Sequence, residues 1–135
     1  MSLIAKTFAP DCVFGMDRYR KAAEQGVPDA QTNLGELCAN GDGIPKDDVE
    51  AVKWFRKAAE QGDARAQFDL GRLYEAGRGI SRNTVEAYAW FSLSTAAGNG
   101  EAPSRLSDLA KRMTPAQMAE GKRRADAWLA QHQRR

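Results

Sequence analysis

A repeated segment constrains this chain more than any other feature of its sequence. Residues 30–62 and 66–98 align 36 positions apart, with 14 identities in 33 aligned positions. The offset also extends backwards, because residues 20–26 recur unchanged as residues 56–62. The chain is therefore a repeat protein, and its fold has to be one in which similar units stack on one another.

The positions that recur define a repeat signature, made mainly of leucine, glycine and tryptophan. These residues are Leu34, Gly35, Gly41, Gly43 and Trp54 in the first copy and Leu70, Gly71, Gly77, Gly79 and Trp90 in the second. The match weakens after residue 98. We expect one domain over 1–135, with a half repeat at 11–26, full repeats at 29–62 and 65–98, an extra first helix at 101–112 and a C-terminal capping helix at 114–133.

Each repeat is predicted to form two amphipathic helices. Apolar residues recur every three or four positions in both halves of a repeat, which places them on one face of a helix. Gly41 and Gly77 suit the left-handed backbone of helix C-caps. Asp47 and Asn83 each precede a glutamate by three residues and suit N-caps. One such pair cannot bury its apolar faces alone, so the pattern predicts an all-α solenoid.

These motifs resemble a known family. The stretches L-G-x-L-C-x-x-G-x-G-I, L-G-x-L-Y-x-x-G-x-G-I and W-F-x-K-A-A-E-Q-G are similar to Sel1-like repeats, which are relatives of tetratricopeptide repeats, over about residues 11–110. The resemblance implies a right-handed α-solenoid that serves as an adaptor for other proteins.

The same resemblance implies a concave face lined by the first helices, on which a peptide or helix of a partner protein binds. The candidate partner-binding residues are Thr32, Glu36, Asn40, Arg65, Phe68, Arg72 and Glu75. Phe68 is the sharpest candidate, because it lies outside the apolar stripe of its helix and near an arginine, as in many binding hot spots. The alternative is that Phe68 packs against the neighbouring helix.

Residues with catalytic or metal-binding chemistry are sparse. The one histidine, His132, is the fourth residue counted from the C-terminus, and no nucleotide-binding or metalloprotease motif is present. We expect no enzyme activity, no cofactor and no metal. Cys12 and Cys38 lack metal-ligand spacing, and Cys38 is interpreted as a small buried thiol, with a disulfide or a reactive thiol as alternatives. An alternative function is weak β-lactam binding or hydrolysis, as discussed for cysteine-rich relatives whose cysteine pair is replaced here by Ala59 and Ala66.

Charge is distributed unevenly along the chain. Residues 111–135 carry seven basic and two acidic side chains, while the net charge of the whole chain is +2. A second alternative is therefore nucleic-acid binding through the C-terminal basic residues Lys111, Arg112, Lys122, Arg123 and Arg124. No apolar run is long enough to span a membrane, and the N-terminus does not read as a signal peptide, which favours the cytoplasm over the periplasm. Self-association through the exposed N-terminal half repeat is a further expectation.

Overall fold

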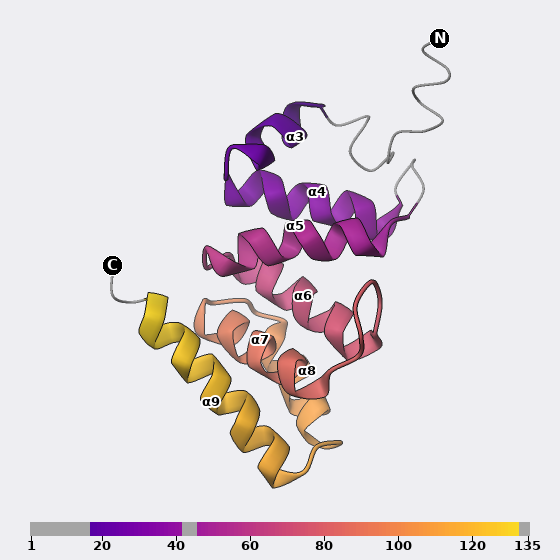
Figure 1. Ribbon diagram of the computed structural model, residues 1–135. Coiled ribbons are helices and arrows are strands. Elements are labelled where there is room, and N and C mark those ends of the chain that lie inside the picture. Colours follow the sequence, from indigo (N-terminus) through magenta and orange to yellow (C-terminus); the bar gives the residue numbers. More distant parts are fainter. Residues whose placement is uncertain (1–16, 42–45, 133–135) are drawn as a thin grey trace.

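The structure is a computed structural model that describes residues 17–41 and 46–132. These residues form seven α-helices and no strand, and the helices stack along the molecule as an α-solenoid (Figure 1). Their bounds are α3 Asp17–Glu24, α4 Pro28–Asn40, α5 Asp48–Glu60, α6 Ala64–Ala76, α7 Thr84–Ala96, α8 Ala102–Ala110 and α9 Pro115–His132. The predicted all-α fold is confirmed. Three parts of the predicted array lie outside the described residues. They are residues 11–16 of the half repeat, Gly43 in the turn of the first full repeat, and residue 133 of the capping helix.

The helices of one repeat pack closely because a glycine faces a phenylalanine. A Cβ atom on Gly35 of α4 would lie 2.7 Å from the ring of Phe55 in α5. The same pair recurs one repeat later, where a Cβ on Gly71 would lie 2.8 Å from Phe91. Real side-chain atoms do not approach so closely, so these helix pairs require the small residue that the repeat signature supplies.

Successive repeats are joined by a buried hydrogen bond that is itself repeated. The Gln31 side-chain amide donates to the carbonyl of Ala23 at 3.0 Å, and the Gln67 amide donates to the carbonyl of Ala59 at 3.2 Å. Both glutamines are buried. Each bond connects a first helix to the end of the preceding second helix and gives the buried side-chain N–H a partner, while Oε1 of Gln67 has none.

The turn between α6 and α7 also contacts the preceding repeat. Arg78 donates two hydrogen bonds to the Asp48 carboxylate, at 2.9 and 3.1 Å, and a third to the carbonyl of Ala39 at 3.2 Å. Gly79 has a φ of +74°, and a Cβ there would lie 2.4 Å from the Asp48 carbonyl oxygen. Glycine is required at this position both by its backbone conformation and by the close approach.

The helix ends follow the sequence signals. Asp47 and Asn83 each accept the backbone N–H of the glutamate three residues later at 3.0 Å. Gly41 and Gly77 adopt left-handed conformations with φ of 66° and 71° at the C-caps of α4 and α6. The predicted caps are therefore confirmed.

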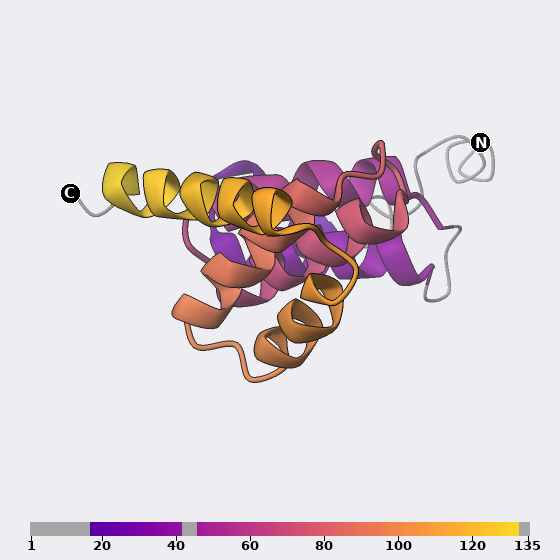
Figure 2. The ribbon, with the colours of Figure 1, turned by 90° about the horizontal axis from the view of Figure 1, so that it is seen from below.

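The C-terminal helix α9 covers α7. Thr114 and Gln117 bond each other's backbone N–H groups reciprocally, at 3.1 and 2.9 Å, and so start this helix. Gly121 and Ala125 are buried, and Met118, Trp128 and Leu129 pack against the core. Figure 2 shows α8 and α9 on different sides of the molecule. The predicted capping helix is thus confirmed.

Cys38 is buried, as expected, but it is not the small buried thiol of the first interpretation. Its sulfur belongs to a disulfide, which was one of the alternatives. None of the described helices is long and apolar enough to cross a membrane.

Candidate functional site

A polar cleft of about 770 Å³ lies across the first helices of successive repeats. Its walls come from α4, α6, α8 and the turn before α8. The lining residues are Glu36, Arg65, Phe68, Asp69, Arg72, Asn99, Gly100, Glu101, Ser104, Arg105 and Asp108. Most of these side chains are charged, so the cleft is suited to polar or charged groups of a ligand. We call it the first-helix cleft.

Contacts between α4 and α6 form part of the cleft wall. Arg65 and Glu36 form an ion pair at 2.8 Å, and both side chains line the cleft. Thr32 does not line it: its hydroxyl donates to the Asp63 carboxylate at 2.7 Å, and the residue is buried. Asn40 is exposed at the end of α4 and is also outside the lining.

Phe68 forms the floor of the cleft. The residue is only 8% exposed, and its ring packs against Phe91 with the ring centres 5.7 Å apart. The guanidinium groups of Arg72 and Arg105 lie over the ring, 5.8 and 6.0 Å from its centre. Phe68 therefore packs against the neighbouring helix, which was the alternative to an exposed anchor, and it presents a partner with two arginines in place of an aromatic surface.

Asp69 and Arg72 contain polar atoms that lack a partner. Asp69 is 6% exposed, and one carboxylate oxygen accepts from Arg72 at 3.1 Å. The other oxygen, Oδ2, and Nε of Arg72 are buried without a hydrogen bond. Burial raises the pKa of Asp69 to about 6, with a further contribution from the nearby Glu36 carboxyl, while the Arg72 charge lowers it. When Asp69 is ionised, an acceptor and a donor are thus both unused in the wall of the cleft, whereas the protonated carboxyl shares a hydrogen bond with Glu36.

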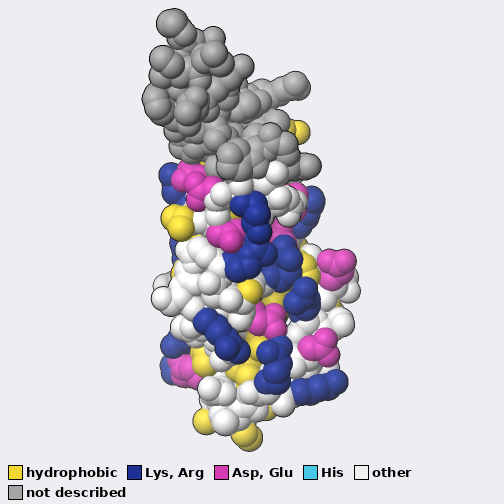
Figure 3. Space-filling model, turned by 90° about the vertical axis from the view of Figure 1, so that its right-hand side faces the viewer, with side chains coloured by type: hydrophobic (Ala, Val, Ile, Leu, Met, Phe, Trp, Pro, Cys, Tyr) yellow, Lys and Arg dark blue, Asp and Glu magenta, His cyan; other side chains and the backbone are white. Residues whose placement is uncertain are grey.

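The cleft continues into a smaller basic pocket of about 320 Å³. Glu75 pairs there with Arg112 at 2.6 Å and with Arg105 at 3.6 Å. Arg72 and Arg78 complete the arginine-rich lining. Over the side of the molecule seen in Figure 3, Lys and Arg side chains are interleaved with Asp and Glu. The charges are therefore mixed, and each arginine near Glu75 already has an acidic neighbour.

The sequence prediction missed the residues that come from α8 and the turn before it. The 36-residue offset between the two full repeats could have identified them. Four of these residues lie 36 positions after a residue of α6 that also lines the cleft. Glu101 follows Arg65, Ser104 follows Phe68, Arg105 follows Asp69 and Asp108 follows Arg72 at that offset. The groove prediction stopped at α6, so this third set of first-helix positions was left out.

Side chains with metal-binding chemistry are scattered over the fold. Within the part of the chain that the structure describes, no group of three or more His, Cys, Asp and Glu side chains is arranged to hold a metal ion. His132 stacks on Trp128 at 3.6 Å between ring centres, and its Nδ1 lies 2.8 Å from the Trp128 carbonyl oxygen. This histidine is therefore part of the packing at the end of α9.

Comparison with known families decides the classification. The Sel1 repeat model matches the chain in three consecutive segments, residues 19–27, 28–63 and 64–99. The chain belongs to the Sel1 repeat family. Sel1 repeat proteins are generally protein-interaction scaffolds and are typically not catalytic. The helix pairs and the glycine-phenylalanine contacts described above are thus those of a Sel1 repeat solenoid.

Solved structures with similar Sel1 repeat folds support the same classification. One is c5321, a protective antigen present in uropathogenic Escherichia coli strains, which is 36% identical with a TM-score of 0.82. The match covers 87% of this chain and 25% of c5321, so the chain spans about a quarter of that protein. A Sel1 repeat protein from Oxalobacter formigenes is 42% identical with a TM-score of 0.64, and the match covers 67% of this chain and 68% of that one. The comparison with curated proteins gives no match.

Proposed function

We propose that this Sel1 repeat protein is a non-catalytic adaptor that holds a peptide or helix of a partner protein in the first-helix cleft. The observation that supports this function best is the pair of unused polar atoms, Oδ2 of Asp69 and Nε of Arg72. Leaving a buried polar group unpaired costs about 1–3 kcal/mol. A bound peptide segment offers both the N–H and the C=O groups that would satisfy them.

The charges around these atoms are suited to orienting the partner. Glu36 and Arg65 line the cleft from α4 and α6, and Arg105 lines it from α8. Mixed charges of this kind favour one direction and register of a bound segment more than they add to affinity. The predicted contacts of Glu36, Arg65, Arg72 and Glu75 with a partner remain part of this proposal.

A peptide selection tests this function and does not require the partner to be identified. Random peptides displayed on phage are selected on the immobilised protein, and the enriched peptides are then synthesised and titrated. We expect Asp69→Ala and Arg72→Lys each to weaken their binding by about 1–3 kcal/mol, since the first removes the acceptor and the second removes Nε while keeping the charge.

Lys122→Ala serves as the matched control, because Lys122 is exposed on α9 and does not line the cleft. This variant should bind the selected peptides as the unmodified protein does. The proposal fails if no peptide is enriched over an unrelated protein, or if the cleft variants, once shown to be folded by circular dichroism, bind all the peptides with unchanged affinity.

The basic residues considered for nucleic-acid binding are largely engaged within the protein. Arg124 pairs with Glu86 at 2.8 Å and with Glu120 at 2.9 Å, Arg123 also pairs with Glu120, and Arg112 pairs with Glu75. These pairs reduce the charge available to phosphates. No observation on the described residues favours β-lactam chemistry.

A further inference from the structure

The second helices carry the same groove twice, 36 residues apart. The C-terminal groove is the surface of α5 and α7 under α9, and it includes Arg56, Glu60, Glu86, Ala89, Trp90 and Leu93. The N-terminal groove, of about 780 Å³, lies on α3 and α5 and includes the equivalent residues Arg20, Glu24, Glu50, Lys53, Trp54 and Lys57. Arginine, both glutamates and tryptophan are identical between the two grooves.

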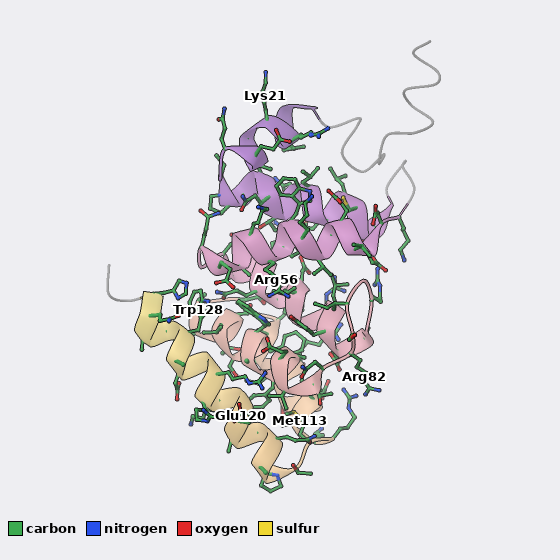
Figure 4. The ribbon with its side chains drawn as sticks, viewed as in Figure 1. Lys21, Arg56, Arg82, Met113, Glu120 and Trp128 are labelled. Atoms are coloured by element: carbon green, nitrogen blue, oxygen red, sulfur yellow. The ribbon has the colours of Figure 1, made fainter. Side chains whose placement is uncertain are left out.

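Helix α9 shows what the C-terminal groove binds. The Trp128 ring meets Trp90 edge to face, with ring centres 6.2 Å apart, and its indole N–H donates to Glu60 at 3.1 Å. One turn earlier, Arg124 donates to Glu86 at 2.8 Å. In Figure 4 the Trp128 side chain points from the end of α9 toward α5 and α7. The groove thus recognises a helix by one tryptophan and one cation.

The N-terminal groove keeps both acceptors and the tryptophan, but no described helix lies over it. Glu24 and Glu50 stand where Glu60 and Glu86 hold α9. Their present partners are surface cations: Arg20 pairs with Glu24 at 3.0 Å, and Lys53 pairs with Glu50 at 3.3 Å. Both cations are exposed, although Glu50 is half-buried, and such pairs are weak enough to be replaced by a partner at small cost.

Two differences between the grooves indicate the charge of the helix that fits. Ala89 and Leu93 of the C-terminal groove are replaced by Lys53 and Lys57, whose ammonium groups lie 5.6 and 6.0 Å from the centre of the Trp54 ring. In the C-terminal groove, Ala127 and Gln131 of α9 line the same pocket as that alanine and leucine. A helix in the N-terminal groove would therefore meet two cations where α9 meets apolar side chains.

We propose that the N-terminal groove binds an amphipathic helix of a partner protein that carries a tryptophan, a basic residue one turn before it, and acidic residues at the positions of Ala127 and Gln131. The tryptophan displaces the lysine stems from Trp54 and donates to Glu24, the basic residue pairs with Glu50, and the acidic residues pair with Lys53 and Lys57. This is a helix-in-groove interaction on a surface separate from the first-helix cleft, so it does not depend on the function proposed above.

The probe is a synthetic peptide of residues 114–132 with Ala127→Glu and Gln131→Glu, labelled for fluorescence anisotropy. It should bind the protein saturably, and a second peptide with Trp128→Ala in addition should bind at least about tenfold more weakly. The protein variant Lys53→Glu/Lys57→Glu should also lose at least about tenfold, because both charges then repel the peptide. Both lysines are exposed, so folding is preserved and is checked by circular dichroism.

Two controls identify the groove and the occupant. Glu86→Gln changes only the C-terminal groove, so it should leave peptide binding unchanged; a loss there would show that the peptide replaces α9 and would overturn the proposal. Light scattering of the protein alone tests a second copy, and a dimer that disappears in Lys53→Glu/Lys57→Glu would assign the groove to self-association instead. Absence of saturable binding, or equal binding to the lysine variant, would also overturn it.

Discussion

The buried glutamines that join successive repeats stabilise the fold at the residue scale. Gln67 is 1% exposed, and its amide donates to the Ala59 carbonyl. Replacing it with alanine removes this bond between repeats and opens a small cavity, although the carbonyl still accepts the Gly62 N–H at 3.0 Å.

We expect Gln67→Ala to lower the free energy of unfolding by about 1–3 kcal/mol in urea titrations. The exposed Gln25→Ala is the control and should change stability by less than about 0.5 kcal/mol. Equal stability of the two variants would show that the repeated amide bond contributes little to the interface between repeats.

Asp69 predicts an unusual dependence of stability on pH. The folded carboxyl has a pKa of about 6, compared with 3.8 for its ordinary value. Between these values the folded chain binds more protons than the unfolded chain, so this group's contribution to stability is fully present below the lower pKa and is lost as pH rises through the higher one. A difference of about two pKa units corresponds to up to about 3 kcal/mol.

Asp69→Asn removes the ionisable group with little change in shape. Near pH 4 we expect similar stabilities for both proteins, and near neutral pH we expect the variant to be the more stable one by up to about 3 kcal/mol. Urea titrations of both proteins over this range measure the difference, in which the contributions of carboxyls that do not interact with Asp69 cancel. A difference that does not vary with pH would contradict a buried, protonated Asp69.

At the scale of single elements, the placement of α9 depends on a close approach to α7. A Cβ on Gly121 would lie 2.7 Å from Cδ1 and 3.1 Å from Cβ of Tyr88. The Cβ atom cannot move without the backbone of α7, so a side chain at residue 121 forces the two helices apart.

Gly121→Ala normally favours a helix by about 1 kcal/mol, but here we expect a loss of about 1–3 kcal/mol through overpacking. The near-ultraviolet circular dichroism of Trp128 and Trp90 should weaken as the helices separate. In a Tyr88→Ala background part of the clash is absent, so the same change should be less destabilising or even favourable. An equal loss in both backgrounds would exclude the clash as the cause.

Local signals were sufficient to predict the helices and their caps. Asp47, Asn83, Gly41 and Gly77 act within one turn of their own position, so the sequence indicates them directly. Contacts that depend on how distant elements meet were not predictable in this way. Trp128 reaches Glu60, 68 residues earlier, because α9 crosses α7 toward α5, and no spacing in the sequence indicates that path.

The candidate cleft shows the same limit. Helical spacing alone placed Phe68 outside its apolar stripe and suggested exposure. The residue is buried because the α7 ring of Phe91 lies beneath it and the guanidinium of Arg105, from α8, lies above it. The burial of Asp69 likewise depends on the packing of α4, α6 and α8, which only the tertiary structure shows.

At the scale of the whole molecule, a solenoid has two ends that must be covered or left as interaction surfaces. In the first described helix and the turn after it, Tyr19 and Val27 are exposed by 38% and 43%. Self-association through the N-terminal half repeat remains a prediction. At the other end, α9 covers apolar side chains of α7, among them Trp90 and the partly buried Tyr88.

Removal of residues 114–135 should expose that surface. We expect the free energy of unfolding of the shortened chain to be lower by at least about 2 kcal/mol, because the apolar surface under α9 is no longer buried. The shortened chain should also associate at concentrations where the full chain does not. Urea titration and light scattering at several concentrations measure both effects. Arg124→Ala, which removes one surface ion pair but keeps the helix, is the control and should change stability by no more than about 1 kcal/mol. A shortened chain that stays monomeric and equally stable would mean that α9 does not stabilise the end of the array, and that its contacts with α5 and α7 serve another purpose.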